Sequence, residues 1–252
     1  MQFFLFFFTG LFIGSFLNVC IYRIPREESI VFPPSHCPAC GTNIKAIDLI
    51  PVISWLALKG RCRSCGARIS ARYPSIELLT GILLLLVYLE TGLTIDFVFL
   101  AVLTATLVVM TFIDVDHQII PDGLVIFLFG VGFLNKVSSL VLNQPAYWLN
   151  SIWGLLLGGG FFLLIAVVSN GGMGGGDIKL MAALGFWFGW QGILMVMFLA
   201  FIIGGVAAVG FLIARKKGRK EMLPFGPFIA LGTYLTALYG SGLWEWYTNL
   251  FM

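Results

Sequence analysis

The longest apolar stretch of the chain, Ile178–Ala214, contains one charged residue, Lys179. As a single helix its 37 residues would be about 55 Å long, whereas the hydrocarbon core of a membrane is about 30 Å thick. We therefore predict that this stretch crosses a membrane twice, with a break at Gly189-Trp190-Gln191-Gly192. The first of the two helices would have only about 12 residues and be too short to reach both membrane surfaces. Asp177, at its start, is therefore expected to lie in a wet recess below the lipid surface.

The rest of the chain has the same character, because 59% of its residues are apolar and 11% are charged, against about a quarter charged in soluble domains. The expected fold is an all-α polytopic membrane protein with about eight transmembrane helices. The N-terminal apolar stretch has no basic region before it and no cleavage site after it, so it is expected to be a retained span. The six further spans are predicted at Phe3–Tyr22, Ile76–Leu89, Phe97–Ile113, Gly123–Leu142, Leu149–Ser169 and Phe225–Tyr247. The stretch Ile76–Leu89 is short for a span.

Basic residues set the expected topology. Thirteen of the 15 Lys and Arg residues lie in two segments, Arg23–Arg72 and Arg215–Lys220. The positive-inside rule places both segments in the cytoplasm, and the number of crossings between them then puts both termini outside. Both carboxylate-bearing segments of the chain fall on the cytoplasmic side. Gly10, Gly14 and Asn18 recur at a spacing of four and predict a helix-packing face.

Acidic residues gather at two of the predicted helix ends. Asp114, Asp116 and Asp122 lie in IDVDHQIIPD, and Asp177 follows the glycines Gly174–Gly176 at the start of a helix. Two carboxylates held close together share a proton, so one can activate water while the other polarises a carbonyl. The residues alone leave open a catalytic pair of Asp114 and Asp177, an ion pathway, or helix caps.

The remaining polar residues near these carboxylates have simpler expected roles. Asp116 and Asp122 are expected to be boundary residues or caps, with Asp122 suited to an N-cap. Lys179 could pair with Asp177 or reach lipid headgroups, and the sequence does not decide between them.

Four of the five cysteines form two CxxC pairs that are 21 residues apart, each followed by glycine. This spacing is close to that of a zinc-ribbon-like site, and cytoplasmic thiols are reduced and available to metal. We predict a structural Zn²⁺ site with four ligands and no open position for catalysis. The ligands are Cys37, Cys40, Cys62 and Cys65.

The expected division of the chain is a first transmembrane helix at 1–22, a cytoplasmic tetracysteine domain at 23–75 and a seven-helix membrane domain at 76–252. The apolar stretch Ile47–Leu58 within the tetracysteine domain is expected either to form its core or to lie on the membrane. The domain is basic, but membrane topology already explains its Lys and Arg residues, so no nucleic-acid partner is expected.

These segments resemble those of a known family, the bacterial type IV prepilin peptidases, also called leader peptidase / N-methyltransferases. The similar segments are GSFLNVCIYRIP (Gly14–Pro25), PPSHCPAC (Pro33–Cys40), RCRSCGARISARYPSIE (Arg61–Glu77), IDVDHQIIPD (Ile113–Asp122), MGGGDIKL (Met173–Leu180) and PFGPF (Pro224–Phe228). The GxGD motif of the family matches Gly174–Asp177, and its first catalytic aspartate matches Asp114.

The resemblance implies an inner-membrane aspartyl peptidase, with its active site facing the cytoplasm, that removes the basic leader of type IV prepilins or pseudopilins. It implies Asp114 and Asp177 as catalytic residues, with Gly174, Gly176, Lys179, Asp116 and Asp122 as active-site support. The tetracysteine segment further implies N-methylation of the new N-terminus with S-adenosylmethionine, whose binding residues the sequence does not identify. Glu77 is a candidate for methylation, although an interfacial charge is the favoured interpretation.

Two other classes of protein remain as alternatives. One is a membrane transporter or channel in which the intramembrane Asp residues form a cation path. The other is a membrane-tethered zinc-ribbon scaffold, which would leave the glycine run and Asp177 unexplained.

Overall fold

The computed structural model describes residues 2–142, 147–214 and 223–251, and every named element in them is helical. The basic run Arg215–Lys220, which was used to predict topology, lies outside the described residues. The chain divides into two units, residues 1–109 and 110–252, and helix α4 runs from the first into the second. The elements are α1 (Gln2–Arg23), η1 (Ile24–Arg26), η2 (Ala46–Leu49), α2 (Ile53–Ala57), α3 (Arg72–Thr91), α4 (Ile95–His117), α5 (Asp122–Val141), α6 (Trp148–Val168), α7 (Gly175–Ile213) and α8 (Gly226–Phe251).

Six helices in the described part of the chain are long and apolar enough to cross a membrane: α1, α3, α4, α5, α6 and α7. This confirms an all-helical, multi-pass membrane protein. Helix α3 is longer than the predicted span, because it begins at Arg72 rather than Ile76 and has 20 residues. Its first turn is polar and contains Pro74, which a first turn tolerates, so the hydropathy pattern alone missed the helix start.

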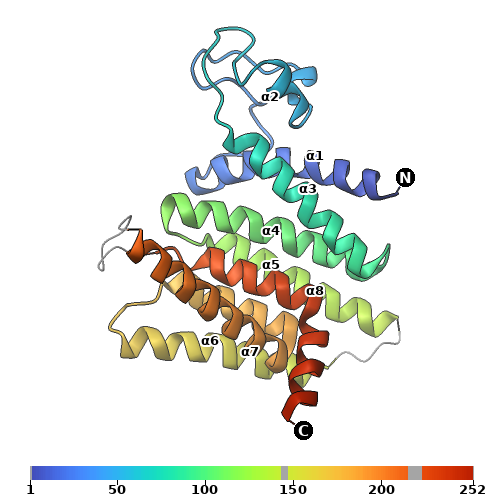
Figure 1. Ribbon diagram of the computed structural model, residues 1–252, viewed down its shortest axis with the longest axis vertical. Helices are drawn as coiled ribbons and strands as arrows, with labels where there is room; N and C mark the ends of the chain where they lie inside the picture. Colours follow the sequence, from blue (N-terminus) through green and yellow to red (C-terminus); the bar gives the residue numbers. More distant parts are fainter. Residues whose placement is uncertain (1, 143–146, 215–222, 252) are drawn as a thin grey trace. The chain divides into compact units, whose positions relative to one another are not determined.

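In the first unit, α1 packs against α3, and the segment between them carries the short helix α2 (Figure 1). The predicted packing face is confirmed at Gly10 and Gly14. A Cβ atom at Gly10 would lie 2.7 Å from the Cα of Gly81, and one at Gly14 would lie 2.7 Å from the Cα of Glu77. The two helices therefore approach more closely than larger side chains would permit.

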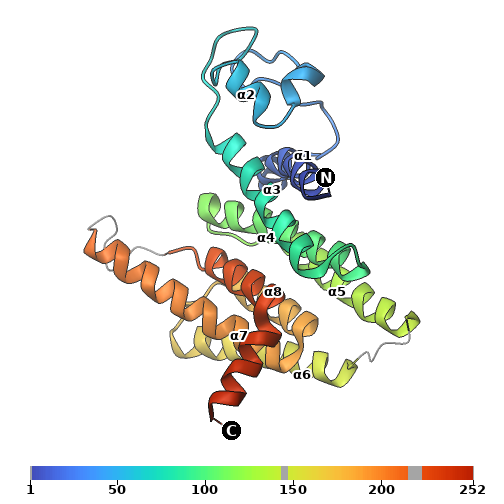
Figure 2. The same cartoon turned by 45° about the vertical axis from the view of Figure 1, so that its right-hand side comes forward.

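In the second unit, α7 packs against α5, α6 and α8, around fully buried Phe162, Leu184 and Ile193. The predicted break in α7 is confirmed at Gly189, whose φ of 72° and ψ of −178° are not helical, and α7 changes direction there (Figures 1 and 2). The side-chain oxygen of Asn150 accepts a hydrogen bond of 3.0 Å from the backbone N–H of Trp190. Asn150 thus satisfies an amide that the break removes from the helix. Counting the two halves of α7 separately and adding α8, the described residues contain seven long helices and the short first half of α7.

Candidate functional site

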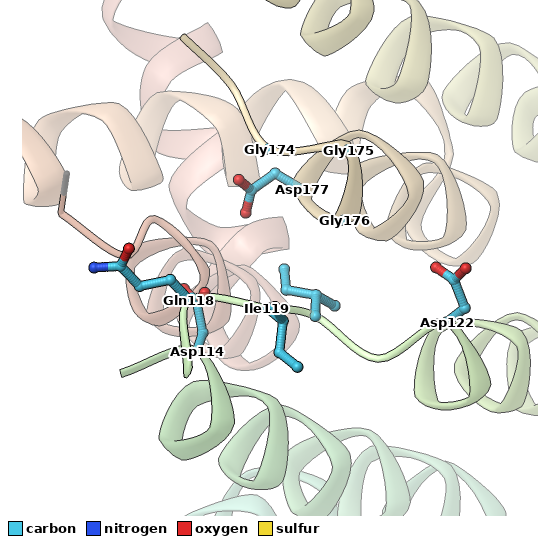
Figure 3. A pocket seen from close by; sticks show the side chains of 9 residues that line it. Asp114, Gln118, Ile119, Asp122, Gly174, Gly175, Gly176 and Asp177 are labelled. Carbon is cyan, nitrogen blue, oxygen red and sulfur yellow. The ribbon is translucent and has the colours of Figure 1, made fainter. Parts of the chain in front are cut away.

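A cavity of about 240 Å³ lies where the end of α4, the start of α5 and the start of α7 meet (Figure 3). The residues that line the cavity all belong to the second unit of the chain. The cavity is lined by Asp114, Gln118, Ile119, Ile120, Asp122, Gly174, Gly175, Gly176 and Asp177. Two carboxylates that are 63 positions apart in the sequence, those of Asp114 and Asp177, therefore face one small space.

Asp114 lies in the last turn of α4 and is only 5% exposed. Its Oδ2 atom accepts a hydrogen bond of 2.9 Å from the backbone N–H of Gly226, the first residue of α8. The N-terminus of a helix carries free N–H groups and a partial positive charge, both of which favour a carboxylate. A Cβ atom at position 226 would lie 2.7 Å from the same Oδ2 atom, so a larger residue there would force the carboxylate to shift.

Asp177 lies in the first turn of α7 and is half-buried. Its carboxylate points towards the side of the cavity where Asp114 and Gln118 lie (Figure 3). Two of the three neighbouring glycines, Gly174 and Gly176, lie close to other atoms, whereas Gly175 has open space beside it. A Cβ atom at Gly174 would lie 3.0 Å from Oδ2 of Asp177, and one at Gly176 would lie 2.8 Å from Cβ of Ile120. The glycine run therefore allows the connection between α4 and α5 to approach the start of α7.

Asp122 and Lys179 form an ion pair in which Lys179 Nζ lies 2.8 Å from both carboxylate oxygens of Asp122. This contact answers the question that the sequence left open, because Lys179 pairs with Asp122 in preference to Asp177. The N-cap interpretation of Asp122 is wrong: Pro121 occupies the N-cap position of α5, and Asp122 is in the first turn. Both side chains of the pair are exposed, and Asp122 lies at the end of the cavity away from Asp114 (Figure 3).

Asp116 is exposed and does not line the cavity. Lys179 does not line the cavity either, whereas the other five predicted residues at this site do: Asp114, Asp122, Gly174, Gly176 and Asp177. Sequence reasoning missed Gln118, Ile119 and Ile120 in the lining and Gly226 behind Asp114. Ile120 gave no signal as a single apolar residue, and the PFGPF segment contains Gly226, whose contribution is a backbone N–H.

The four paired cysteines form a second cluster, in the first unit. Their Sγ atoms all lie within 4.8 Å of one another, and those of Cys37 and Cys65 are 3.9 Å apart. A tetrahedral Zn²⁺ with Zn–S bonds of about 2.3 Å holds its sulfurs about 3.8 Å apart, so this donor set fits zinc. All four thiols are free of disulfides.

Each CxxC pair forms a tight turn. Gly41 donates to the carbonyl of Cys37 at 2.8 Å and Gly66 to that of Cys62 at 2.9 Å, and both glycines have positive φ, as predicted for such turns. A hydrogen bond of 3.4 Å joins Cys40 Sγ to the hydroxyl of Thr42. The side chain and backbone of Thr42 lower the pKa of Cys40 to about 6, which favours the thiolate that a metal requires.

The fold and these two clusters define a class: a helical multi-pass membrane protein in which two aspartates meet at the ends of its helices. The chain belongs to the type IV leader peptidase family. Residues 101–209 match that family, and residues 8–91 match the bacterial peptidase A24 N-terminal domain. No solved structure is significantly similar to this chain.

Three similar proteins, each named prepilin leader peptidase/N-methyltransferase, match nearly the whole chain. The protein of Aeromonas salmonicida (strain A449) is 35% identical, covering 99% of this chain and 94% of the relative. That of Dichelobacter nodosus is 38% identical, covering 93% and 92%. That of Pseudomonas aeruginosa is 34% identical, covering 94% and 90%.

Proposed function

We propose that this protein is a membrane aspartyl endopeptidase that removes the leader from type IV prepilins or pseudopilins and then N-methylates the new N-terminal residue. Membership of the type IV leader peptidase family supports the cleavage, and the names of the relatives support both activities. The observation that carries the proposal is the shared cavity of Asp114 and Asp177.

In the proposed mechanism, Asp114 and Asp177 are the catalytic residues. Two carboxylates facing one cavity do not both ionise easily and hold one proton between them. The ionised member takes a proton from a water molecule, which attacks the carbonyl carbon of the scissile peptide bond. The protonated member donates a hydrogen bond to the carbonyl oxygen and stabilises the negative charge that develops there. The carboxyl group that took the proton from water then gives it to the leaving amine as the C–N bond breaks, and neither a metal nor a nucleophilic side chain is needed.

In this proposal the support residues hold the elements that carry the two catalytic aspartates in position. Gly174 and Gly176 permit the close approach at the start of α7, and the Asp122–Lys179 pair links the start of α5 to the first turn of α7. Gly226 fixes the orientation of Asp114 through its N–H. Asp116 does not line the cavity. Its place among the support residues rests on the family resemblance alone.

The tetracysteine cluster is proposed to hold a structural Zn²⁺. Four thiolates close the coordination shell, so the metal would stabilise the segment rather than take part in either reaction. S-adenosylmethionine is the proposed methyl donor, and it would supply the methyl group for the new N-terminal amine.

We further propose that the protein lies in the bacterial inner membrane with the Asp114–Asp177 cavity facing the cytoplasm. The support is the basic segment between α1 and α3, which the positive-inside rule retains in the cytoplasm. The proposed division is a first helix at 1–22, a tetracysteine domain at 23–75 and a membrane peptidase domain at 76–252.

The function is tested with purified full-length protein in lipid nanodiscs and a prepilin as substrate. Mass spectrometry should detect a cleaved product, and a further gain of one methyl group when S-adenosylmethionine is added. Asp114→Asn and Asp177→Asn should each reduce cleavage by about 1,000-fold or more, whereas Asp96→Asn, at the opposite end of α4, should leave it unchanged. Normal cleavage by either active-site variant would remove that aspartate from the catalytic role.

A further inference from the structure

The segment from η2 to α2 exposes the apolar side chains that a small domain would normally bury. Ile47 is 64% exposed, Ile53 57% and Leu56 61%. Leu49, the last residue of η2, and Ile50, which follows it, are exposed as well. Of the two roles that the sequence left open for this stretch, the core of the tetracysteine domain is therefore excluded, and its apolar surface needs another partner.

The orientation of this surface is fixed by contacts on the other side of α2. Trp55 donates a hydrogen bond of 3.1 Å from its ring nitrogen to the carbonyl of Ile69, and its ring packs on Gly60. Ile53 and Leu56, three positions apart, share the other face of this short helix.

The first of the two short helices is held in a similar way. Arg63 forms a two-pronged ion pair with Asp48 in η2, and its shortest N–O distance is 2.7 Å. The guanidinium of Arg63 also lowers the pKa of Asp48, so the pair is charged at neutral pH. The polar contacts thus hold both short helices against the cysteine turns and leave their apolar side chains facing outward.

A buried carboxylate sets the depth of α2 relative to the membrane helices. Glu77, on α3, is 8% exposed and accepts a hydrogen bond of 2.7 Å from the backbone N–H of Val52, which immediately precedes α2. Glu77 lies five residues after Arg72, the first residue of α3, which corresponds to about 7.5 Å along the helix axis. Amphipathic helices that lie on a membrane bury their apolar faces about 5–10 Å into the boundary between headgroups and acyl chains.

Two polar side chains of α1 make further contacts near its junction with the segment. Arg23, the last residue of α1, is buried and donates hydrogen bonds to the carbonyls of Ser29 at 2.9 Å and Pro33 at 2.6 Å. Asn18 donates a hydrogen bond of 3.2 Å to the carbonyl of Tyr73. The backbone of the segment is thus held near its beginning by Arg23 and in its middle by Glu77, while Asn18 joins α1 to the first turn of α3.

Exposed apolar side chains on α1 and α3 also indicate contact with lipid in the first unit. Phe12 and Phe16 on α1 and Ile82 on α3 are exposed, as expected for side chains that face acyl chains. Lys45 and Lys59 flank the η2–α2 stretch and are exposed, and basic residues in such positions are attracted to anionic lipid headgroups.

We propose that η2 and α2 form a membrane-interface anchor, in which Ile47, Ile53 and Leu56 insert into the lipid leaflet that surrounds the Arg23 end of α1. Lys45 and Lys59 then lie at the level of the headgroups. The tetracysteine segment is accordingly a partly embedded part of the membrane protein, and Glu77 is the positioning residue that sets the depth of α2.

The test uses the full-length protein in nanodiscs of phosphatidylethanolamine and phosphatidylglycerol. A spin label is introduced through a non-canonical amino acid, which spares the cysteines, at position 53, 56, 12 or 68. Labels at 53 and 56 should collide more often with oxygen than with a water-soluble nickel chelate, as should the lipid-facing control at 12. The label at 68, where Arg68 is exposed on the second cysteine turn, should show the reverse. Preference for nickel at 53 and 56 overturns the anchor, and so does inaccessibility to both reagents, because the surface would then be covered by protein.

A second measurement does not depend on the spin label. A photoreactive benzophenone residue at position 47 or 56 should form lipid adducts that mass spectrometry detects, and adducts with protein alone would again overturn the proposal. Glu77 is tested with the label at 53. Glu77→Gln keeps an oxygen that can accept from Val52 and should preserve the preference for oxygen, whereas Glu77→Ala should shift it towards nickel. An unchanged preference in Glu77→Ala removes the positioning role from Glu77.

Discussion

The backbone N–H of Gly226 donates a hydrogen bond of 2.9 Å to the carboxylate of Asp114, 112 residues earlier in the chain. The start of α8 thus completes the surroundings of an aspartate carried by α4. The carboxylate is held by a backbone group, and a side chain at position 226 would force the carboxylate to shift, because its Cβ atom would lie 2.7 Å from the oxygen.

Gly226→Ala should reduce leader cleavage by about 100-fold, because the new Cβ atom would lie 2.7 Å from Oδ2 of Asp114 and displace the carboxylate. Gly242→Ala on the same helix is the matched control, since no atom lies within 4 Å of its added Cβ. Initial rates of cleavage measure both variants. Equal rates in Gly226→Ala and the unchanged protein would show that the orientation of Asp114 does not depend on this contact.

Gly176→Ala should also lower cleavage, by about tenfold or more, through a different contact. Its Cβ atom would meet Ile120 at 2.8 Å and push the connection between α4 and α5 away from α7. The carboxylates on the two elements would then separate. Gly130→Ala on α5, which faces open space, provides the control. A normal rate in Gly176→Ala would contradict the role given to this close approach.

The Asp122–Lys179 pair should matter more for activity than for stability. Exposed ion pairs contribute about 0.2–1 kcal/mol, so Lys179→Gln should change the thermal midpoint little while lowering cleavage. The reversed pair, Asp122→Lys with Lys179→Asp, should recover part of the lost rate. High salt screens the ion pair and should therefore lower the rate of cleavage by the unchanged protein, as Lys179→Gln does. Failure of the reversed pair to exceed both single variants would argue against an electrostatic link between α5 and α7.

Cys40→Ser should reduce bound zinc from about one ion per chain to far less and should impair methylation more than cleavage. Cys20→Ala, which removes a buried thiol outside the cluster, should retain the metal. Metal analysis of the purified proteins, together with the masses of the processed products, measures both effects. An absence of zinc from the unchanged protein would refute the metal site.

Much of this fold could be predicted, because membrane spans are set by hydropathy and length. The break in α7 followed from a stretch too long for one crossing, and Gly189 is where the helix gives way. The close packing of α1 on another helix followed from the spacing of Gly10 and Gly14, although that spacing did not identify α3 as the partner. The start of α3 did not follow, because its first turn is polar and hydropathy recognises only the apolar part of a helix.

The site was predictable where side chains carry it and not where backbone does. A carboxylate after a glycine run marks Asp177, but a backbone donor such as Gly226 leaves no distinctive residue type in the sequence. The partner of Lys179 depends on which helix ends meet, which hydropathy does not encode. The exposure of Ile53 and Leu56 could not be read from composition either, because a buried core and a lipid-facing surface have the same apolar residues.

The tetracysteine segment is attached through Arg23 and Glu77, and this affects how a metal bound there would be lost and regained. These contacts involve none of the cysteines, so removal of a bound Zn²⁺ by a chelator would leave them in place. The two thiol pairs then stay close to each other instead of diffusing apart as on an unfolded chain. A metal ion should accordingly rebind quickly, without refolding of the segment, and the enzyme should remain folded during short periods of zinc depletion.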